Sequence, residues 1–132
     1  MKKYLSKIIA QDISGLQMIT ALIADAEVKI DEVKYLPKNK IFLLSLKRHG
    51  RETENVKSII NSIVKFDFII SCKSLNINLY DKSLPLKLLT INTFKDNGQF
   101  QIRLLFDNNK SIELCSEIIE CQLEDQNQVK ND

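Results

Sequence analysis

The sequence predicts an α+β fold in which one N-terminal amphipathic helix packs on a mostly antiparallel, strongly curved sheet of about six to eight strands. Three observations predict it: a helical apolar period near the start, alternation of apolar and polar residues later, and turn residues between these segments. The chain has 132 residues, of which 44% are hydrophobic and 27% charged, and this length suits one domain. We expect the domain over residues 1–125 and a polar tail over 126–132. A partial barrel or a pleckstrin-like barrel is the alternative shape.

The helix is predicted near the N-terminus, after a short strand over residues 4–10. Apolar residues and one threonine recur there on one helical face: Leu16, Ile19, Thr20 and Ile23. Asp12 precedes them, and its side chain can accept a hydrogen bond from the free amides at a helix start. We therefore expect a helix of about three turns, held by its apolar face, because Gly15 lowers its intrinsic propensity.

Extended structure is predicted after Ala26, where apolar and polar residues begin to alternate. The phase of the alternation changes near Asp31, which indicates a bulge or a turn. Leu36-Pro37-Lys38-Asn39 is typical of a type I turn. The following segments are expected as a hairpin strand over 41–47, a polar loop over 48–55, one bent strand or two successive strands over 56–73, and a loop over 74–85.

A three-stranded meander is predicted over residues 86–119. Asn97-Gly98 is a strong hairpin signal, and it pairs Leu89 with Phe106, Ile91 with Leu104, and Thr93 with Ile102. A second loop over 108–110 then pairs Phe106 with Ile112 and Leu104 with Leu114, and it places Arg103 opposite Cys115. The buried face is expected to carry Leu89, Ile91, Phe100, Ile102, Leu104, Phe106, Ile112, Leu114 and Ile118.

Charge is nearly balanced overall but unevenly distributed. The chain has 19 basic and 17 acidic residues, a formal net charge of +2. Residues 34–51 contain bases and no acid, whereas residues 113–125 contain acids and no base. Two solvated faces that partly neutralise each other would explain this pattern. A functional reading assigns binding to the basic hairpin, and its candidate residues are Lys47, Arg48, His49 and Arg51.

Catalytic and metal-binding motifs are not recognised. His49 is the only histidine, and the three cysteines lack the spacing of a zinc site. The three glycines are too scattered for a phosphate-binding loop. Neighbouring carboxylates that could form an acid–base pair are Asp31 with Glu32, Glu52 with Glu54, and Glu113 with Glu117. We assign no catalytic residue, no metal and no cofactor.

Four short segments of the chain resemble a known family. They are Asp25-Ala26-Glu27-Val28, Tyr35-Leu36-Pro37-Lys38, Phe66-Asp67, and the ending from Ile112-Glu113-Leu114 to Leu123-Glu124-Asp125. Over residues 12–125 the sequence resembles the alphaproteobacterial domain-of-unknown-function family DUF2948. The resemblance implies a bacterial cytosolic protein without an assigned activity, cofactor or catalytic residue.

The function expected from the sequence is that of a non-enzymatic protein-binding or adaptor module with an acidic protein partner. The alternatives are a small enzyme or small-molecule-binding domain with a pocket near His49, and a weak nucleic-acid binder acting through residues 34–51. Without an apolar run of about 20 residues or an export signal, we expect a cytoplasmic protein that does not insert into membranes. An unpaired strand edge would permit a homo-oligomer.

Overall fold

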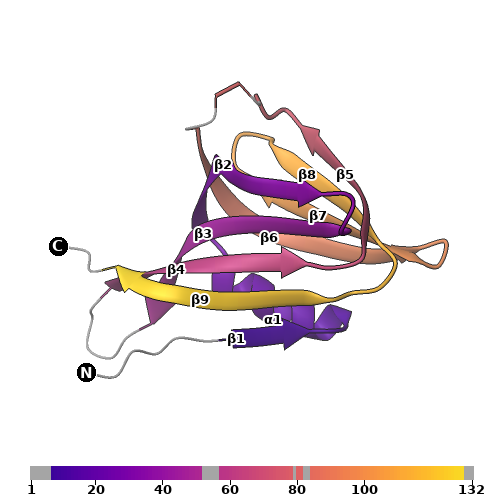
Figure 1. The fold of residues 1–132 in the computed structure, drawn as a ribbon. Helices are drawn as coiled ribbons and strands as arrows, with labels where there is room; N and C mark the ends of the chain where they lie inside the picture. The colour runs from indigo at the N-terminus through magenta and orange to yellow at the C-terminus, as the bar shows by residue number, and fades with distance from the viewer. Residues whose placement is uncertain (1–6, 52–56, 79, 82–83, 130–132) are drawn as a thin grey trace.

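The computed structural model describes residues 7–51, 57–78, 80–81 and 84–129 (Figure 1). These residues form nine strands and one helix. In chain order the elements are β1 (Lys7–Ala10), α1 (Ile13–Ile23), β2 (Ala26–Leu36), β3 (Ile41–Arg51), β4 (Lys57–Phe66), β5 (Ile69–Leu75), β6 (Pro85–Asp96), β7 (Gln99–Phe106), β8 (Ser111–Ser116) and β9 (Cys121–Val129).

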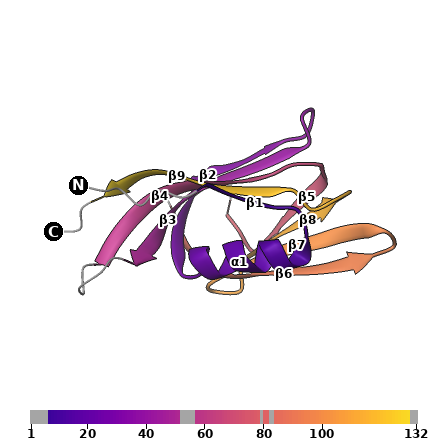
Figure 2. The ribbon, with the colours of Figure 1, turned by 90° about the horizontal axis from the view of Figure 1, so that it is seen from below.

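All nine strands belong to one sheet with the order β1-β9-β4-β3-β2-β6-β7-β8-β5. Every neighbouring pair is antiparallel, and β1 and β5 form the two edges. In Figure 2, β4, β9 and β2 run along one side of the molecule, and β6 runs along the other with α1 beside it. The core lies between these two halves.

The predicted α+β class is wrong. The fold is a mostly antiparallel β fold with an open nine-stranded sheet, and the only helix among the described residues has eleven residues. The sheet is larger than expected because segments assigned to loops continue as strands: β3 extends to Arg51, where a loop from residue 48 was predicted. Since β1 and β5 remain edges, the sheet is open and does not close into a barrel.

The predicted helix start at Asp12 is confirmed. The Asp12 Oδ1 atom accepts a hydrogen bond from the Gly15 amide at 2.7 Å. The buried residues of α1 are Leu16, Ile19 and Ile23, three of the four expected on that face. Gly15 has a packing reason, because a Cβ atom there would lie 3.1 Å from the Cβ of Ala10 on β1.

The hairpin from β2 to β3 follows the predicted pattern. Its register shifts between Val28 and Val33, which confirms the irregularity expected near Asp31. The turn is closed by a hydrogen bond from the Asn39 amide to the Leu36 carbonyl at 3.1 Å. Residues 56–73, left open as one strand or two, supply two strands, β4 and β5, which lie in different halves of the sheet.

The meander of β6, β7 and β8 is confirmed in part. Ile91 pairs with Leu104, and Thr93 with Ile102, as the Asn97-Gly98 turn predicts. The pairing of Leu89 is wrong, because the register shifts between Leu88 and Thr90, and Leu89 is 45% exposed.

The second meander loop lies one residue earlier than predicted. The Phe106 amide donates to the Lys110 carbonyl at 2.8 Å, so residues 107–109 form the loop. Both Asn108 and Asn109 adopt a positive φ of 59°, a conformation that asparagine tolerates well. Leu104 therefore pairs with Ile112 instead of Leu114. A shift of two residues preserves the faces of a strand, which is why most of the expected core residues are still buried.

At the end of the meander, the buried isoleucine is Ile119 instead of the predicted Ile118. Ile118, expected in the core, is 49% exposed, whereas Ile119 is buried. Phe100 is partly buried and packs against the core. The remaining predicted core residues of the meander are buried: Ile91, Ile102, Leu104, Phe106, Ile112 and Leu114.

Candidate functional site

The four predicted binding residues lie on β3 but do not form one surface. Lys47 and His49 are exposed, whereas Arg48 between them is buried on the opposite face. This separation follows from the alternation of side chains along a strand. The backbone of Arg51 pairs with Lys57, and the side chain of Arg51 lies outside the described residues.

Arg48 forms an internal ion pair. Its Nε and Nη2 atoms donate hydrogen bonds to the two carboxylate oxygens of Asp125 on β9, at 2.9 Å and 2.6 Å. The Ser62 hydroxyl on β4 donates to Asp125 Oδ1 at 2.6 Å. The side chains of Arg48 and Asp125 are 7% and 0% exposed. A buried pair with these contacts joins three strands and leaves Arg48 inaccessible to an external partner.

Among the described side chains, two ion pairs join the basic segment 34–51 to the acidic segment 113–125. One is the pair of Arg48 with Asp125, and the other joins Lys40 Nζ to Glu117 Oε1 at 2.7 Å. The interpretation that the two charged faces partly neutralise each other therefore has direct structural support. The hairpin retains less free positive charge than its sequence suggests.

Lys47 and His49 line a hollow on the outer face of the sheet. Its volume is about 310 Å³, and both signs of charge surround it. The other residues of its wall are Asp25, Glu27, Ile59, Pro85, Leu86, Lys87 and Asp107. Glu27 on β2 pairs in register with Lys47 on one side and Lys87 on the other. This hollow is the pocket near His49 that the sequence raised as an alternative.

An apolar cavity lies in the other half of the β2–β3 hairpin, and sequence reasoning missed it. It has a volume of about 180 Å³. Its lining consists of Ile30, Val33, Tyr35, Phe42, Cys72, Ser74, Ile77, Leu86 and Ile112. The cavity exists because β5 passes the β2–β3 turn, where the Ile69 amide donates to the Lys40 carbonyl at 2.9 Å. The alternation of Val33 and Tyr35 was visible in the sequence, but the approach of β5 was not.

Two of the three cysteines have thiols that favour the protonated form. Burial raises the pKa of Cys72, and burial together with the Asp67 carboxylate raises the pKa of Cys121. Cys115 lies opposite Gln101 instead of the predicted Arg103. Its sulfur contacts the side-chain amides of two glutamines on β7, Gln99 and Gln101.

Of the carboxylate pairs in the sequence, Glu113 and Glu117 are separated by their ion partners, whereas Asp31 and Glu32 line one hollow together. Glu113 pairs with Arg103 Nε at 3.0 Å, while Glu117 pairs with Lys40. Glu52 and Glu54 lie outside the described residues. No group of three or more histidine, cysteine, aspartate or glutamate side chains in the described part of the chain could hold a metal ion.

These features define a small antiparallel β protein with a charged outer hollow and an apolar cavity beside an edge strand. The chain belongs to the family described as protein of unknown function, DUF2948, whose model matches residues 6–131. The resemblance seen in the sequence is thus confirmed for the family. No curated protein and no solved structure matches the chain. Among the residues described by the structure, no helix has the length and apolar character needed to span a membrane.

Proposed function

We propose that the protein is a non-enzymatic protein-binding module that docks an acidic partner surface through the β2–β3 hairpin. The observation that carries this proposal is the set of hairpin lysines without an internal ion pair. Lys34, Lys38 and Lys47 are exposed, and no carboxylate of the described residues lies within ion-pair distance of their ammonium groups. Free charges of one sign steer a partner of the opposite sign and select against others.

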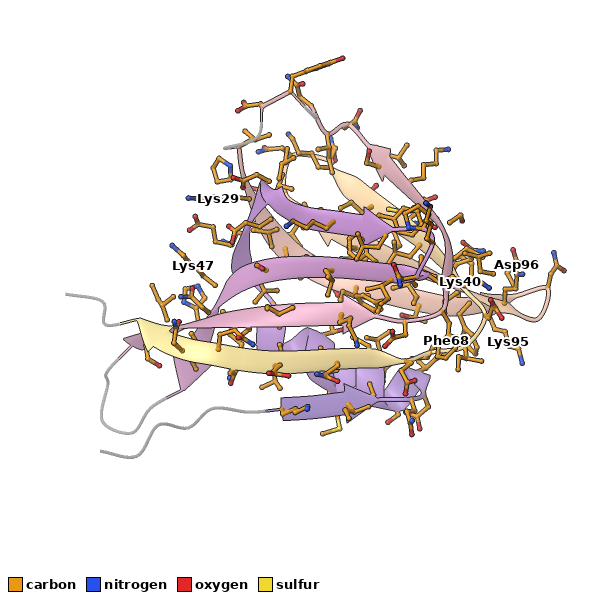
Figure 3. All side chains as sticks on the ribbon, viewed as in Figure 1. Lys29, Lys40, Lys47, Phe68, Lys95 and Asp96 are labelled. Atoms are coloured by element: carbon orange, nitrogen blue, oxygen red, sulfur yellow. The ribbon has the colours of Figure 1, made fainter. Side chains whose placement is uncertain are left out.

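The three free lysines differ in this respect from Lys40 and Arg48, whose charges are compensated within the chain. In Figure 3, Lys29 and Lys47 lie at one end of the hairpin, and Lys40 lies at the other end with Phe68. The three uncompensated lysines, Lys34, Lys38 and Lys47, are called the basic surface, and they are spread along the hairpin from its turn to the end at Lys47. The proposal places the module in the cytoplasm, a compartment in which the free cysteines would stay reduced.

The experiment compares two charge-reversed variants of the full chain. Lys34→Glu/Lys38→Glu/Lys47→Glu removes the basic surface, and Lys7→Glu/Lys65→Glu/Lys95→Glu reverses three lysines elsewhere. Each reversal changes the charge by −2, so both triple variants go from the formal net charge of +2 to −4. Tagged protein is used to isolate partners from extract of the source cells at low salt, after nuclease treatment.

The proposal expects that wild type and the control variant retain one protein in stoichiometric amount. The Lys34/Lys38/Lys47 variant should retain at least about tenfold less of it, because three ionic contacts are removed. Its retention should also fall with added salt. Equal retention by both triple variants, or retention that depends on nucleic acid, would contradict the proposal. Glu27 and Asp31 on the same outer face as Lys47 already weigh against a phosphate backbone as partner.

A small-molecule-binding domain or small enzyme is the second candidate, because His49 lines the outer hollow together with two lysines and three acids. A zwitterionic molecule would suit such mixed charge. This candidate expects NMR shifts of the His49 ring when a panel of amino acids is added. A His49→Gln variant lacks these ring signals, so its spectrum identifies which signals belong to His49. Absence of any shift at millimolar concentration would leave protein binding as the function to pursue.

A further inference from the structure

Strand β5 has one free edge. It ends the sheet order and forms a ladder only with β8, over Ile69 to Leu75, and at its start the Ile69 amide donates to the Lys40 carbonyl. On its other side no strand of the described residues forms a ladder with it. The free N–H and C=O groups of such an edge can pair with an extended chain from another protein.

The apolar cavity lies beside this edge. Cys72 and Ser74 of β5 form one wall, and Val33 and Tyr35 of β2 form the facing wall. Because side chains alternate along a strand, Ser71 and Lys73 point away from the cavity. An extended segment added to β5 would present every second side chain to the same space.

The size of the cavity decides which occupant it suits. Pockets for drug-sized molecules are about 300–1,000 Å³, whereas a cavity of about 150 Å³ takes a benzene-sized group. The volume here is about 180 Å³, which matches one large apolar side chain. Its lining is mostly aliphatic and aromatic, with the polar atoms of Tyr35 and Ser74 available at the wall.

The surroundings of the edge favour a peptide with acidic residues. Lys73 is exposed on β5 itself and points to the face opposite the cavity, as would the residues on either side of the anchor in an added strand. Apolar groups next to the edge are also exposed, with Ile70 at 40% and Leu75 at 37%. Charge and apolar surface together fit an extended segment better than a free small molecule.

We propose that the partner is bound as an extended peptide segment that adds to the free edge of β5 and inserts one large apolar side chain into the cavity, with acidic residues flanking this anchor. The inference rests on the proposed function, since it names the part of the partner that the module recognises.

Two substitutions on β5 distinguish a role of the cavity from a role of the opposite face of the strand. Ser74→Leu fills the cavity from its wall, and Ser71→Leu places the same side chain on the opposite face. Both serines are exposed, so neither change disturbs the core. Ser74→Leu should abolish anchor insertion, while Ser71→Leu should leave it intact.

The experiment selects peptides from a displayed random library on the immobilised full-length chain. The proposal expects enriched sequences with one large apolar residue flanked by Asp or Glu. Synthetic copies should bind Ser71→Leu as they bind wild type and should bind Ser74→Leu at least about tenfold more weakly, the loss expected when a leucine-sized side chain is no longer buried. Failure to enrich any peptide, or equal binding to the two variants, would overturn the proposal.

Peptides with N-methyl groups test strand addition separately and do not depend on the folding of a variant. Successive amides of a strand point in opposite directions, so only every second amide of the peptide can donate to β5. N-methylation of these amides should abolish binding, and N-methylation of the intervening amides should be tolerated. Equal tolerance of both phases would overturn strand addition.

Other occupants of the edge have distinct outcomes. A dimer that Ser74→Leu converts to monomer would show that a second copy covers β5 and would overturn the proposal. If toluene binds in the cavity without competing with the peptide, the peptide does not insert a side chain there, and the proposal is overturned. If Ser74→Leu retains the isolated partner and the Lys34/Lys38/Lys47 variant loses it, the proposed function stands and this inference fails. If Ser74→Leu loses the partner and the Lys34/Lys38/Lys47 variant retains it, peptide binding at β5 stands and docking through the basic surface is rejected.

Discussion

Arg48 on β3 and Asp125 on β9 are joined by two hydrogen bonds across β4, which lies between their strands. The two residues come from the basic and acidic segments of the sequence, and they are 77 positions apart. Ser62 on the intervening strand donates a third hydrogen bond to the same carboxylate. The network therefore fixes the mutual register of three strands and removes one cation of the basic segment from the surface.

Replacing Arg48 should strongly destabilise the protein. Arg48→Met removes a buried cation that pairs with the Asp125 carboxylate, and such a change costs about 3–5 kcal/mol. The exposed neighbour provides a matched control, because Lys47→Met should change the free energy of unfolding by no more than about 0.5 kcal/mol. Urea denaturation of the three proteins measures both values. Similar small losses in the two variants would show that the pair contributes little.

The helix cap should account for a smaller loss. Asp12→Ala removes the acceptor of the Gly15 amide and should cost about 1 kcal/mol. Asp12→Asn keeps a side-chain oxygen at the cap, so it should lower the free energy of unfolding by only about 0.3 kcal/mol. Thermal or urea unfolding distinguishes the two, and equal losses would argue that the hydrogen bond is not what stabilises the helix start.

The faces of β7 should respond in opposite ways to polar substitution. Leu104 is fully buried, and Leu104→Asp should unfold the domain because it places an unpaired charge in the core. Arg103 lies on the other face in a partly exposed pair with Glu113, so Arg103→Gln should cost less than about 1 kcal/mol. Circular dichroism and melting curves would detect both. A stable Leu104→Asp variant would mean that the strand faces are misassigned.

Alkaline pH should weaken the fold through Cys121. Burial and the nearby Asp67 carboxylate raise the pKa of this thiol above its ordinary value of 9.0. Above that pH the unfolded chain loses the thiol proton while the folded chain keeps it. The stabilisation is thus complete below pH 9 and declines as pH rises, by at most about 1.4 kcal/mol per pH unit for one proton.

Cys121→Val isolates this effect from the other groups that titrate at high pH. The difference in unfolding free energy between wild type and Cys121→Val should be constant up to pH 9 and should then shift against wild type. Urea denaturation between pH 7 and pH 10.5 gives this difference. Parallel pH profiles for the two proteins would rule out a contribution from the thiol.

Local features of the fold were predictable because they depend on neighbours in the sequence. Asp12 caps the helix by contacting a residue three positions away, and Asn97-Gly98 sets the β6–β7 register through its own backbone conformation, with positive φ at both residues. Leu89 shows the limit of this reasoning. A register shift before Thr90 turns Leu89 outward, and nothing in its own segment signals that shift.

The candidate site was less predictable because its features arise from long-range packing. Arg48 looked like a surface cation beside Lys47 until β9 brought Asp125 against it. The cavity requires Tyr35 and Cys72 to face each other, although they lie on strands that are separated in both sequence and sheet order. The prediction of an α+β class was wrong for a related reason, since β3 and β5 pair with their neighbours beyond the ends expected from their own sequence.

Amide hydrogen exchange of the full chain, with and without saturating partner isolated by the tagged protein, tests the central claim most directly. Binding of a protein segment at β5 predicts slower exchange at residues 71–75 and at the hairpin residues 34–38, with no change at β1, the other edge of the sheet. Unchanged exchange at both segments, or protection confined to the outer hollow at Lys47 and His49, would contradict it.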